Sequence, residues 1–169
     1  KQSEELKSLN ELQQKVQVLC EQEQQKMDTL RSEAIEEALS KVSVVCATCS
    51  GAGDKMFKKQ VFTHCLMDEA AQAIEPEVYV PLTHGVGHLV LVGDHCQLGP
   101  VIKSTLAQRL GLGTSLFERL LRCEYPSHML STQYRMHPEL ASFTSSQFYN
   151  SKLTNGVRAA DRPRIPAFP

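Results

Sequence analysis

The first forty residues differ from the rest of the chain in how apolar and polar positions alternate. They contain no Gly or Pro and are rich in Glu, Gln, Lys and Leu, which favour helix. Apolar residues recur at helical spacing in residues 6–19 and again in 27–39, and the polar run 21–26 separates the two groups. This pattern predicts two antiparallel helices, a helical hairpin in residues 1–40 with its turn near 21–26. The apolar seam also fits a coiled-coil partner module, although it is short and interrupted.

Beyond residue 40 the apolar runs are short and bounded by turn residues, as in buried strands. Residues 41–48, 61–67 and 88–92 are runs of this kind. Residues 76–82 lie between the second and third runs and are predicted to form a short helix that starts at a proline. A strand–helix–strand order with short connections is typical of parallel strands joined by a right-handed crossover. We therefore predict an α/β fold built on a parallel sheet.

The segment after residue 100 predicts a second group of elements. Thr114 or Ser115 should cap a helix over 116–121. A short strand is predicted over 129–132, and a further helix should start at Pro138. The side chains expected to pack that last helix are Leu140, Phe143, Phe148 and Tyr149.

Acids and amides follow two of the predicted strands directly. Asp68 and Glu69 come after 61–67, and Asp94 and Gln97 come after 88–92. Ligands of open α/β sheets bind beyond the carboxyl ends of the strands, so these side chains should face a common crevice. Two adjacent carboxylates can hold Mg²⁺ and orient an attacking water, and the neutral Gln97 amide can contact a γ-phosphate or that water. The alternative is that the two acids only cap the helix near residue 75.

Small and hydroxyl residues follow the predicted strand 41–48 and could contact a phosphate backbone. Small side chains permit close approach, and the hydroxyls and amides could hold phosphate oxygens. The candidate contacts are Thr48, Ser50, Gly51, Ala52 and Gly53. The alternative is an ordinary turn between two elements.

Four ordered segments, 68–77, 91–101, 115–120 and 133–138, resemble motif II, motif III, a linking helix and motif IV of superfamily 1 helicases. The nearest likeness is to the up-frameshift type of RNA helicase, which acts in nonsense-mediated mRNA decay. Residues 46–54 are similar to that family's nucleic-acid backbone contact, and 155–162 extend the likeness toward the carboxyl end. The likeness covers nearly the whole chain.

The resemblance implies a RecA-like parallel sheet, with 41–126 as the carboxyl-terminal part of a first motor domain and 127–169 as the start of a second. The boundary should fall at 123–128. Residues 1–40 take the place of a helical insertion that helps clamp RNA, and residues 158–164 are expected to form an exposed, mobile tail.

The resemblance also implies roles for individual residues. Asp68 would hold Mg²⁺, and Glu69 would orient the attacking water. Gln97 and Arg135 would contact the γ-phosphate of ATP, and Tyr134 would stack on adenine. A planar, permanently charged guanidinium suits Arg135 to stabilising a transferring phosphoryl group. In the absence of the family likeness, the segment around Tyr134 could equally be a capped helix start with a core tyrosine.

Composition limits the setting and the partners. The 18 basic and 19 acidic side chains give no overall field that attracts nucleic acid. Neither a membrane span nor a secretory signal is recognised, which suggests a cytoplasmic setting, with a nuclear one as the alternative. The six cysteines include one close pair, Cys46 and Cys49, which lacks a second pair at zinc-finger spacing. The implied ligands and partners are ATP, Mg²⁺, single-stranded RNA or alternatively DNA, and proteins of an mRNA decay complex.

The glycine-rich loop with a lysine that cradles the β- and γ-phosphates does not occur in the sequence. We therefore expect an internal fragment, or a truncated product, of an ATP-dependent helicase that hydrolyses ATP negligibly by itself. Two other classes remain open. One is a catalytically inactive nucleic-acid-binding remnant, and the other is a helical interaction module acting through residues 1–40.

Overall fold

The computed structural model describes residues 2–162, with side chains from residue 9 onward. The chain divides into two compact units. Unit 1 comprises Lys1–Cys65 and Pro76–Leu89, and unit 2 comprises Leu66–Glu75 and Val90–Pro169. None of the described helices is both long enough and apolar enough to cross a membrane.

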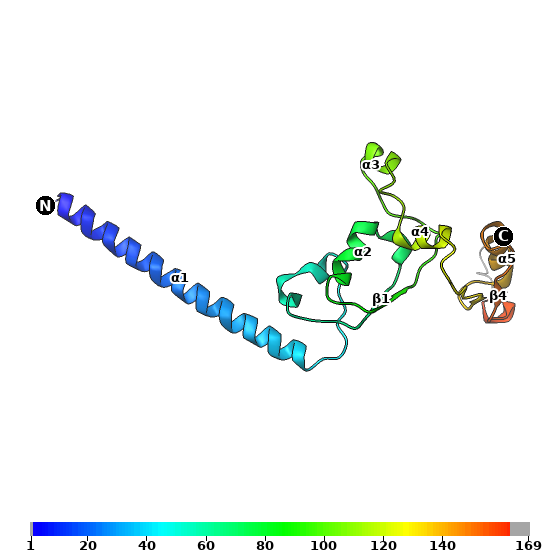
Figure 1. Ribbon diagram of the computed structural model, residues 1–169, viewed down its shortest axis with the longest axis horizontal. Helices are drawn as coiled ribbons and strands as arrows, with labels where there is room; N and C mark the ends of the chain where they lie inside the picture. The colour runs from blue at the N-terminus through cyan, green and yellow to red at the C-terminus, as the bar shows by residue number, and fades with distance from the viewer. Residues whose placement is uncertain (1, 163–169) are drawn as a thin grey trace. The chain divides into compact units, whose positions relative to one another are not determined.

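Unit 1 begins with one continuous helix, α1 (Gln2–Ser40), drawn in blue to cyan in Figure 1. The predicted hairpin in residues 1–40 is therefore wrong. The polar run 21–26 consists only of Glu, Gln and Lys, which continue a helix, and it offers no glycine or proline to reverse the chain. Side-chain contacts one turn apart cross this run, including the 3.1 Å hydrogen bond from Gln24 Nε2 to Asp28 Oδ1.

Residues 41–48 form no strand, so this prediction is also wrong. Most of these residues are exposed, and the side chain of Val44 is 77% exposed. Their β-branched side chains favour an extended backbone, but an extended segment becomes a strand only where a neighbour pairs with it. No described strand pairs with this segment.

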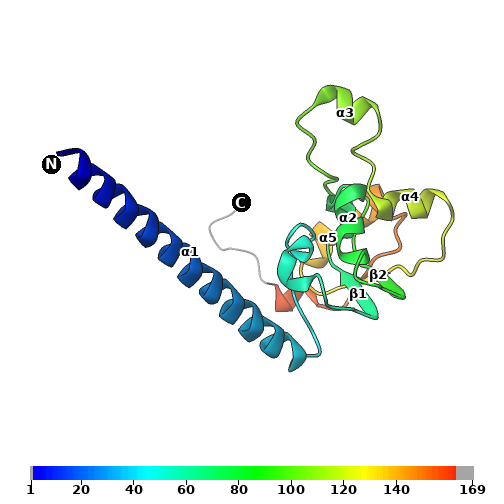
Figure 2. The ribbon, with the colours of Figure 1, turned by 60° about the vertical axis from the view of Figure 1, so that its left-hand side comes forward.

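The predicted strand–helix–strand order is confirmed. Strand β1 (His64–Met67) pairs with β2 (His88–Leu91), and α2 (Glu75–Leu82) connects them. The N–H of His88 donates to Thr63 O at 3.0 Å and that of Val92 to Met67 O at 2.8 Å. Donor and acceptor advance along the chain by the same step in the same direction, as they do between parallel strands (Figure 2).

Unit 2 holds the remaining elements. They are α3 (Thr105–Arg109), α4 (Leu116–Arg122), β3 (Thr132–Gln133), α5 (Pro138–Phe148) and β4 (Thr154–Asn155). Strands β3 and β4 are parallel. The strand predicted over 129–132 therefore begins only at its last residue. Together the two parallel pairs and their helices confirm the α/β class and agree with a partial RecA-like fold.

The inward face of α5 is made of small residues. Ala141 is 2% exposed and Ser145 is 6% exposed, whereas the expected packing residues Leu140, Phe143 and Phe148 are all more than half exposed. The prediction that these three side chains pack the helix is therefore wrong. The chain that follows α5 packs against its small residues instead. Ser145 Oγ accepts from the N–H of Leu153 at 3.1 Å.

The segment 158–162 is exposed, as predicted, but Arg162 within it donates hydrogen bonds to the backbone of residues 134 and 135. It contains a 3-10 helix, η4 (Ala159–Asp161), and a fork of hydrogen bonds between Arg158 and Asp161. The rest of that prediction, residues 163 and 164, lies outside the described residues. The predicted domain bounds 41–126 and 127–169 stay predictions; the two compact units divide the chain at other positions.

Candidate functional site

The segments that follow β1 and β2 touch at the backbone in unit 2. The N–H of Ala70 donates to Val92 O at 2.8 Å. A Cβ added at Gly93 would lie 3.0 Å from Ala71 N, so only glycine lets the two backbones approach this closely. The acidic segment after β1 and the Asp94 segment after β2 therefore start from adjacent positions at the carboxyl ends of the two strands.

Asp68 and Glu69 lie at the exposed tip of the first segment. Glu69 has φ of 52° and ψ of 35°, the left-handed conformation, which is uncommon and costly for a residue with a side chain. Its N–H donates to Asp68 Oδ1 at 2.9 Å, and its carboxylate accepts from Gln72 Nε2 at 3.0 Å. In the described part of the chain, neither carboxylate accepts a hydrogen bond from an amide of α2, so the helix-cap alternative has no support.

Packing beneath this tip holds it in place. The 3-10 helix η3 (Ala70–Gln72) packs against α4, and the side chains of Ala70 and Ala71 are buried. The helix α4 begins at the buried Ser115, whose hydroxyl accepts from the N–H of Glu118 at 3.1 Å, as predicted for a cap.

Arg119 of α4 adds a second fastening. Its guanidinium donates from Nε and Nη2 to the two carboxylate oxygens of Glu75, at 2.8 and 2.6 Å. This bidentate pair ties α4 to the residue that follows the acidic segment and begins α2.

Asp94 organises the second segment. Its Oδ1 accepts from the N–H of Cys96 at 2.9 Å, and its Oδ2 accepts from Gln97 Nε2 at 2.8 Å and from the hydroxyl of Tyr149 at 2.5 Å. Burial favours the neutral acid and works to raise the pKa of Asp94. The three hydrogen bonds, with the charge of His95, outweigh burial, so the pKa of Asp94 lies below its usual value.

The same contacts act on Tyr149 and Gln97. The hydrogen bond to Asp94 and then burial raise the pKa of Tyr149 to about 12, so its hydroxyl remains a donor at neutral pH. Because the amide nitrogen of Gln97 is held by Asp94, its carbonyl oxygen is oriented by that bond. A carbonyl oxygen held in this way can accept a hydrogen bond from a water molecule.

Asp94, His95 and Cys96 also bring three potential metal ligands within 4.8 Å of one another. Both oxygens of Asp94 are already engaged in holding the segment, and burial and the Asp94 charge raise the pKa of the Cys96 thiol. Nitrogen and sulfur ligands do not suit Mg²⁺, which takes oxygen ligands. The exposed carboxylate of Asp68 is the better match for that ion.

A side chain that sequence reasoning missed, Gln133, builds the turn that presents Tyr134 and Arg135. Its Oε1 accepts from the N–H groups of Arg135 and Met136, at 2.9 and 2.7 Å. Its Nε2 donates to Met136 O and to Asn155 Oδ1, at 2.9 and 2.7 Å. The Gln133 amide thus makes three hydrogen bonds within the turn and one to Asn155, and its place directly before Tyr134 was the only sequence signal.

The side chains of Tyr134 and Arg135 are both exposed. Tyr134 is 64% exposed, and a Cβ added at Gly156 would overlap its ring, so the ring lies against the glycine backbone. Arg135 is exposed, and its guanidinium makes no hydrogen bond or ion pair with a described residue. Both side chains are therefore presented to solvent from a rigid turn.

The segment 48–53 lies in unit 1 and is described separately. It forms a turn and the 3-10 helix η1 (Gly51–Gly53), in which the N–H of Gly51 donates to Thr48 Oγ1 at 3.0 Å and that of Ala52 to Thr48 O at 2.9 Å. The N–H of Gly53 donates to Ser50 O at 3.1 Å. These amides are engaged within the turn, so the hydroxyls of Thr48 and Ser50 are the groups best able to meet a phosphate oxygen.

The chain matches known proteins over most of its length. One family model, described as AAA domain, matches residues 1–105, and a second AAA domain model matches residues 112–167. The regulator of nonsense transcripts 1 homolog of Neurospora crassa is 44% identical over 162 residues, covering 96% of this chain and 15% of that protein. The homolog in Drosophila melanogaster is 44% identical over 165 residues, covering 98% of this chain and 14% of that protein.

A third relative carries a name that states its activity. The ATP-dependent helicase NAM7 of Saccharomyces cerevisiae is 43% identical over 158 residues, covering 94% of this chain and 16% of that protein. The chain therefore spans less than a fifth of the length of each of these three relatives.

Proposed function

Because this chain belongs to the AAA-domain family of superfamily 1 helicases of the up-frameshift type, we propose that it forms part of an ATP-driven motor acting on single-stranded RNA. The names of the matched relatives, which refer to nonsense transcripts and to an ATP-dependent helicase, support this proposal. They also support a role in mRNA decay, together with proteins of a decay complex. We propose a cytoplasmic setting, with a nuclear one as the alternative.

The observation that carries the proposal is the contact between the two segments that leave β1 and β2. Hydrogen bonds join Val92 to both Met67 and Ala70, at 2.8 Å each. Asp68 and Glu69 lie between Met67 and Ala70 on the first segment. Asp94 comes two residues after Val92 on the second segment. Two acids on one segment and an oriented amide on the adjoining segment suit a site where a triphosphate is attacked by water.

The roles of the residues follow from their chemistry. Asp68 would hold Mg²⁺, and its exposed carboxylate fits an ion that keeps most of its water shell. When bound, the ion would offset negative charge on the phosphate oxygens. Glu69 would orient the attacking water and accept its proton, and the carbonyl oxygen of Gln97 would hold that water or contact the γ-phosphate.

The turn before α5 would supply the remaining nucleotide contacts. The guanidinium of Arg135 would stabilise charge on the transferring phosphoryl group, and the ring of Tyr134 would stack on adenine. The hydroxyls of Thr48 and Ser50, with the glycine-containing turn at 51–53, would contact the RNA backbone. Such contacts position a strand without reading its sequence.

ATP hydrolysis in a chimera tests the proposal. In the chimera, residues 1–169 replace the matched segment of NAM7, and hydrolysis is measured with and without single-stranded RNA or DNA. We expect RNA-stimulated hydrolysis, and we expect Arg135→Ala to lower kcat by about 10³-fold, as for other arginines that contact the phosphoryl group.

The matched control is Arg122→Ala, which removes an exposed arginine of α4 that pairs only with Glu118 among the described residues. It should leave kcat unchanged. A folded chimera without RNA-stimulated hydrolysis, or equal effects of the two arginine substitutions, would overturn the proposal and favour an inactive binding remnant. Stronger stimulation by DNA than by RNA would overturn the choice of substrate.

A further inference from the structure

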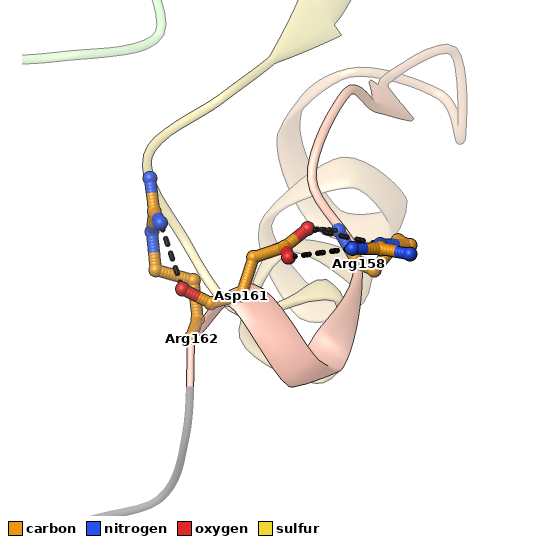
Figure 3. Close-up of polar contacts among 3 residues, drawn as sticks. All are labelled: Arg158, Asp161 and Arg162. Carbon is orange, nitrogen blue, oxygen red and sulfur yellow. Dashed lines mark hydrogen bonds and ion pairs between the residues drawn. The ribbon is translucent and has the colours of Figure 1, made fainter.

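The side chain of Arg162 fastens the backbone of the turn that carries Tyr134 and Arg135. Its Nη2 donates to Tyr134 O at 2.8 Å, and its Nε donates to Arg135 O at 3.0 Å. Its Nη1 donates to Asp161 O at 2.9 Å (Figure 3). Each of the three guanidinium nitrogens thus meets a different backbone carbonyl.

A second arginine braces the segment from which Arg162 extends. Arg158 donates to the carboxylate of Asp161 from its N–H at 2.9 Å, its Nε at 3.3 Å and its Nη2 at 3.1 Å (Figure 3). The side-chain hydrogen bonds of Arg158 and then its backbone hydrogen bond lower the pKa of Asp161 below its usual value. The carboxylate therefore stays charged at neutral pH, and the closed turn of η4 sets where Arg162 begins.

The geometry of these contacts is specific to a guanidinium. The carbonyls of Tyr134 and Arg135 belong to consecutive residues, and a planar fork can reach both at once, whereas the ammonium of lysine acts as a single point charge. The amide of Gln133 already holds the N–H of Arg135 on the opposite side of the same backbone. The peptide group between Tyr134 and Arg135 is therefore held at its N–H by Gln133 and at its carbonyl by Arg162.

We propose that Arg162 is a positioning residue for ATP turnover. Its guanidinium is engaged with three backbone carbonyls, so it would act through Tyr134 and Arg135. It fixes the backbone from which the adenine-stacking ring of Tyr134 and the guanidinium of Arg135 extend, and the pair Arg158–Asp161 holds it in place. This inference rests on the proposed function, since it concerns the same nucleotide site.

Steady-state hydrolysis in the chimera tests the inference with Arg162→Lys and Arg162→Ala. A misplacement of reacting groups by about 1 Å lowers rates by about 100-fold, so we expect kcat to fall by about 10- to 100-fold in both variants. The preference for ATP over UTP in kcat/KM should also shrink, because the adenine-stacking ring is no longer fixed. Guanidinium ion added at non-denaturing concentration should restore part of the kcat of Arg162→Ala and leave that of Arg162→Lys unchanged.

A merely structural role would lower the unfolding temperature, leave the preference for ATP over UTP unchanged and show no rescue by guanidinium. Arg109→Lys, at the exposed end of α3, serves as the control and should behave as the unsubstituted chimera. If Arg162→Lys keeps full kcat and full ATP preference while Arg135→Ala abolishes turnover, the inference fails and the proposed function stands. If Arg135→Ala is also without effect, the proposed function itself fails.

Discussion

The contact between Tyr149 and Asp94 gives a quantitative prediction for the chain itself. The substitution Tyr149→Phe removes one hydroxyl and keeps the ring. That hydroxyl donates at 2.5 Å to Asp94 Oδ2, the same oxygen that accepts from Gln97. The change therefore weakens the anchor of the Gln97 amide and removes a link between that segment and the end of α5.

The expected magnitude follows from the charge of the acceptor. A hydrogen bond to a charged group contributes roughly 1.5–3 kcal/mol to the free energy of unfolding. Tyr149 and Asp94 are both half-buried, so water can take over part of the bond. We expect a loss of about 1–1.5 kcal/mol at pH 7, at or just below the lower limit of that range.

The dependence on pH gives the prediction its sign. The pKa of Asp94 is lowered in the folded chain, so its contribution is present above the unfolded pKa of about 4 and is lost as pH falls through the lower folded value. The pKa of Tyr149 is raised to about 12, so its contribution is lost as pH rises from about 10 through that value. The difference between the two proteins should therefore be largest at neutral pH and shrink toward both extremes.

Urea unfolding followed by circular dichroism at pH 3, 7 and 11 measures this difference. The exposed Tyr125 provides the control, and Tyr125→Phe should change the free energy of unfolding by less than about 0.5 kcal/mol at each pH. A Tyr149→Phe variant as stable as the parent at pH 7, or a loss of equal size at all three pH values, would refute the reasoning.

Three further experiments test the architecture of the site. Glu69→Asn places a residue that tolerates the left-handed conformation at φ of 52° and should raise the free energy of unfolding by up to about 1 kcal/mol while removing hydrolysis; a lower stability would contradict the strain. Gly156→Ala forces the ring of Tyr134 to move and should lower stability by about 1–3 kcal/mol and reduce ATP affinity in the chimera, whereas no change in either would show that the ring does not lie there. A double-mutant cycle of Glu75→Gln and Arg119→Met should give a coupling of about 0.5–1 kcal/mol that weakens at high salt, and a coupling of zero would remove this bidentate pair from the account.

Local signals were sufficient for the centre of the fold. The strands at 64–67 and 88–91 and the helix at 75–82 agree with their apolar runs and turn residues, and the cap at Ser115 agrees with its hydroxyl side chain. These features depend on residues close together in the sequence. Periodicity and capping rules describe such features directly.

Features that depend on distant partners were missed. Residues 41–48 have the composition of a strand, but no described strand pairs with them. The error over α1 was instead local, because nothing within residues 21–26 reverses the helix. The contact of Arg162 with the carbonyls of Tyr134 and Arg135 joins residues far apart in the sequence. The candidate roles of the site residues came from the family likeness, whereas the scaffold that holds them became visible only in three dimensions.

Hydrolysis by the Glu69→Gln chimera tests the nucleotide site most directly. The substitution keeps the size of the side chain and removes the group that would accept a proton from water. Binding of a fluorescent ATP analogue in the presence of Mg²⁺ should stay within about threefold of the parent, and kcat for ATP should fall by about 10²- to 10⁴-fold. Unchanged hydrolysis in a folded Glu69→Gln chimera would contradict the assignment of the two acids at the end of β1 to ATP turnover.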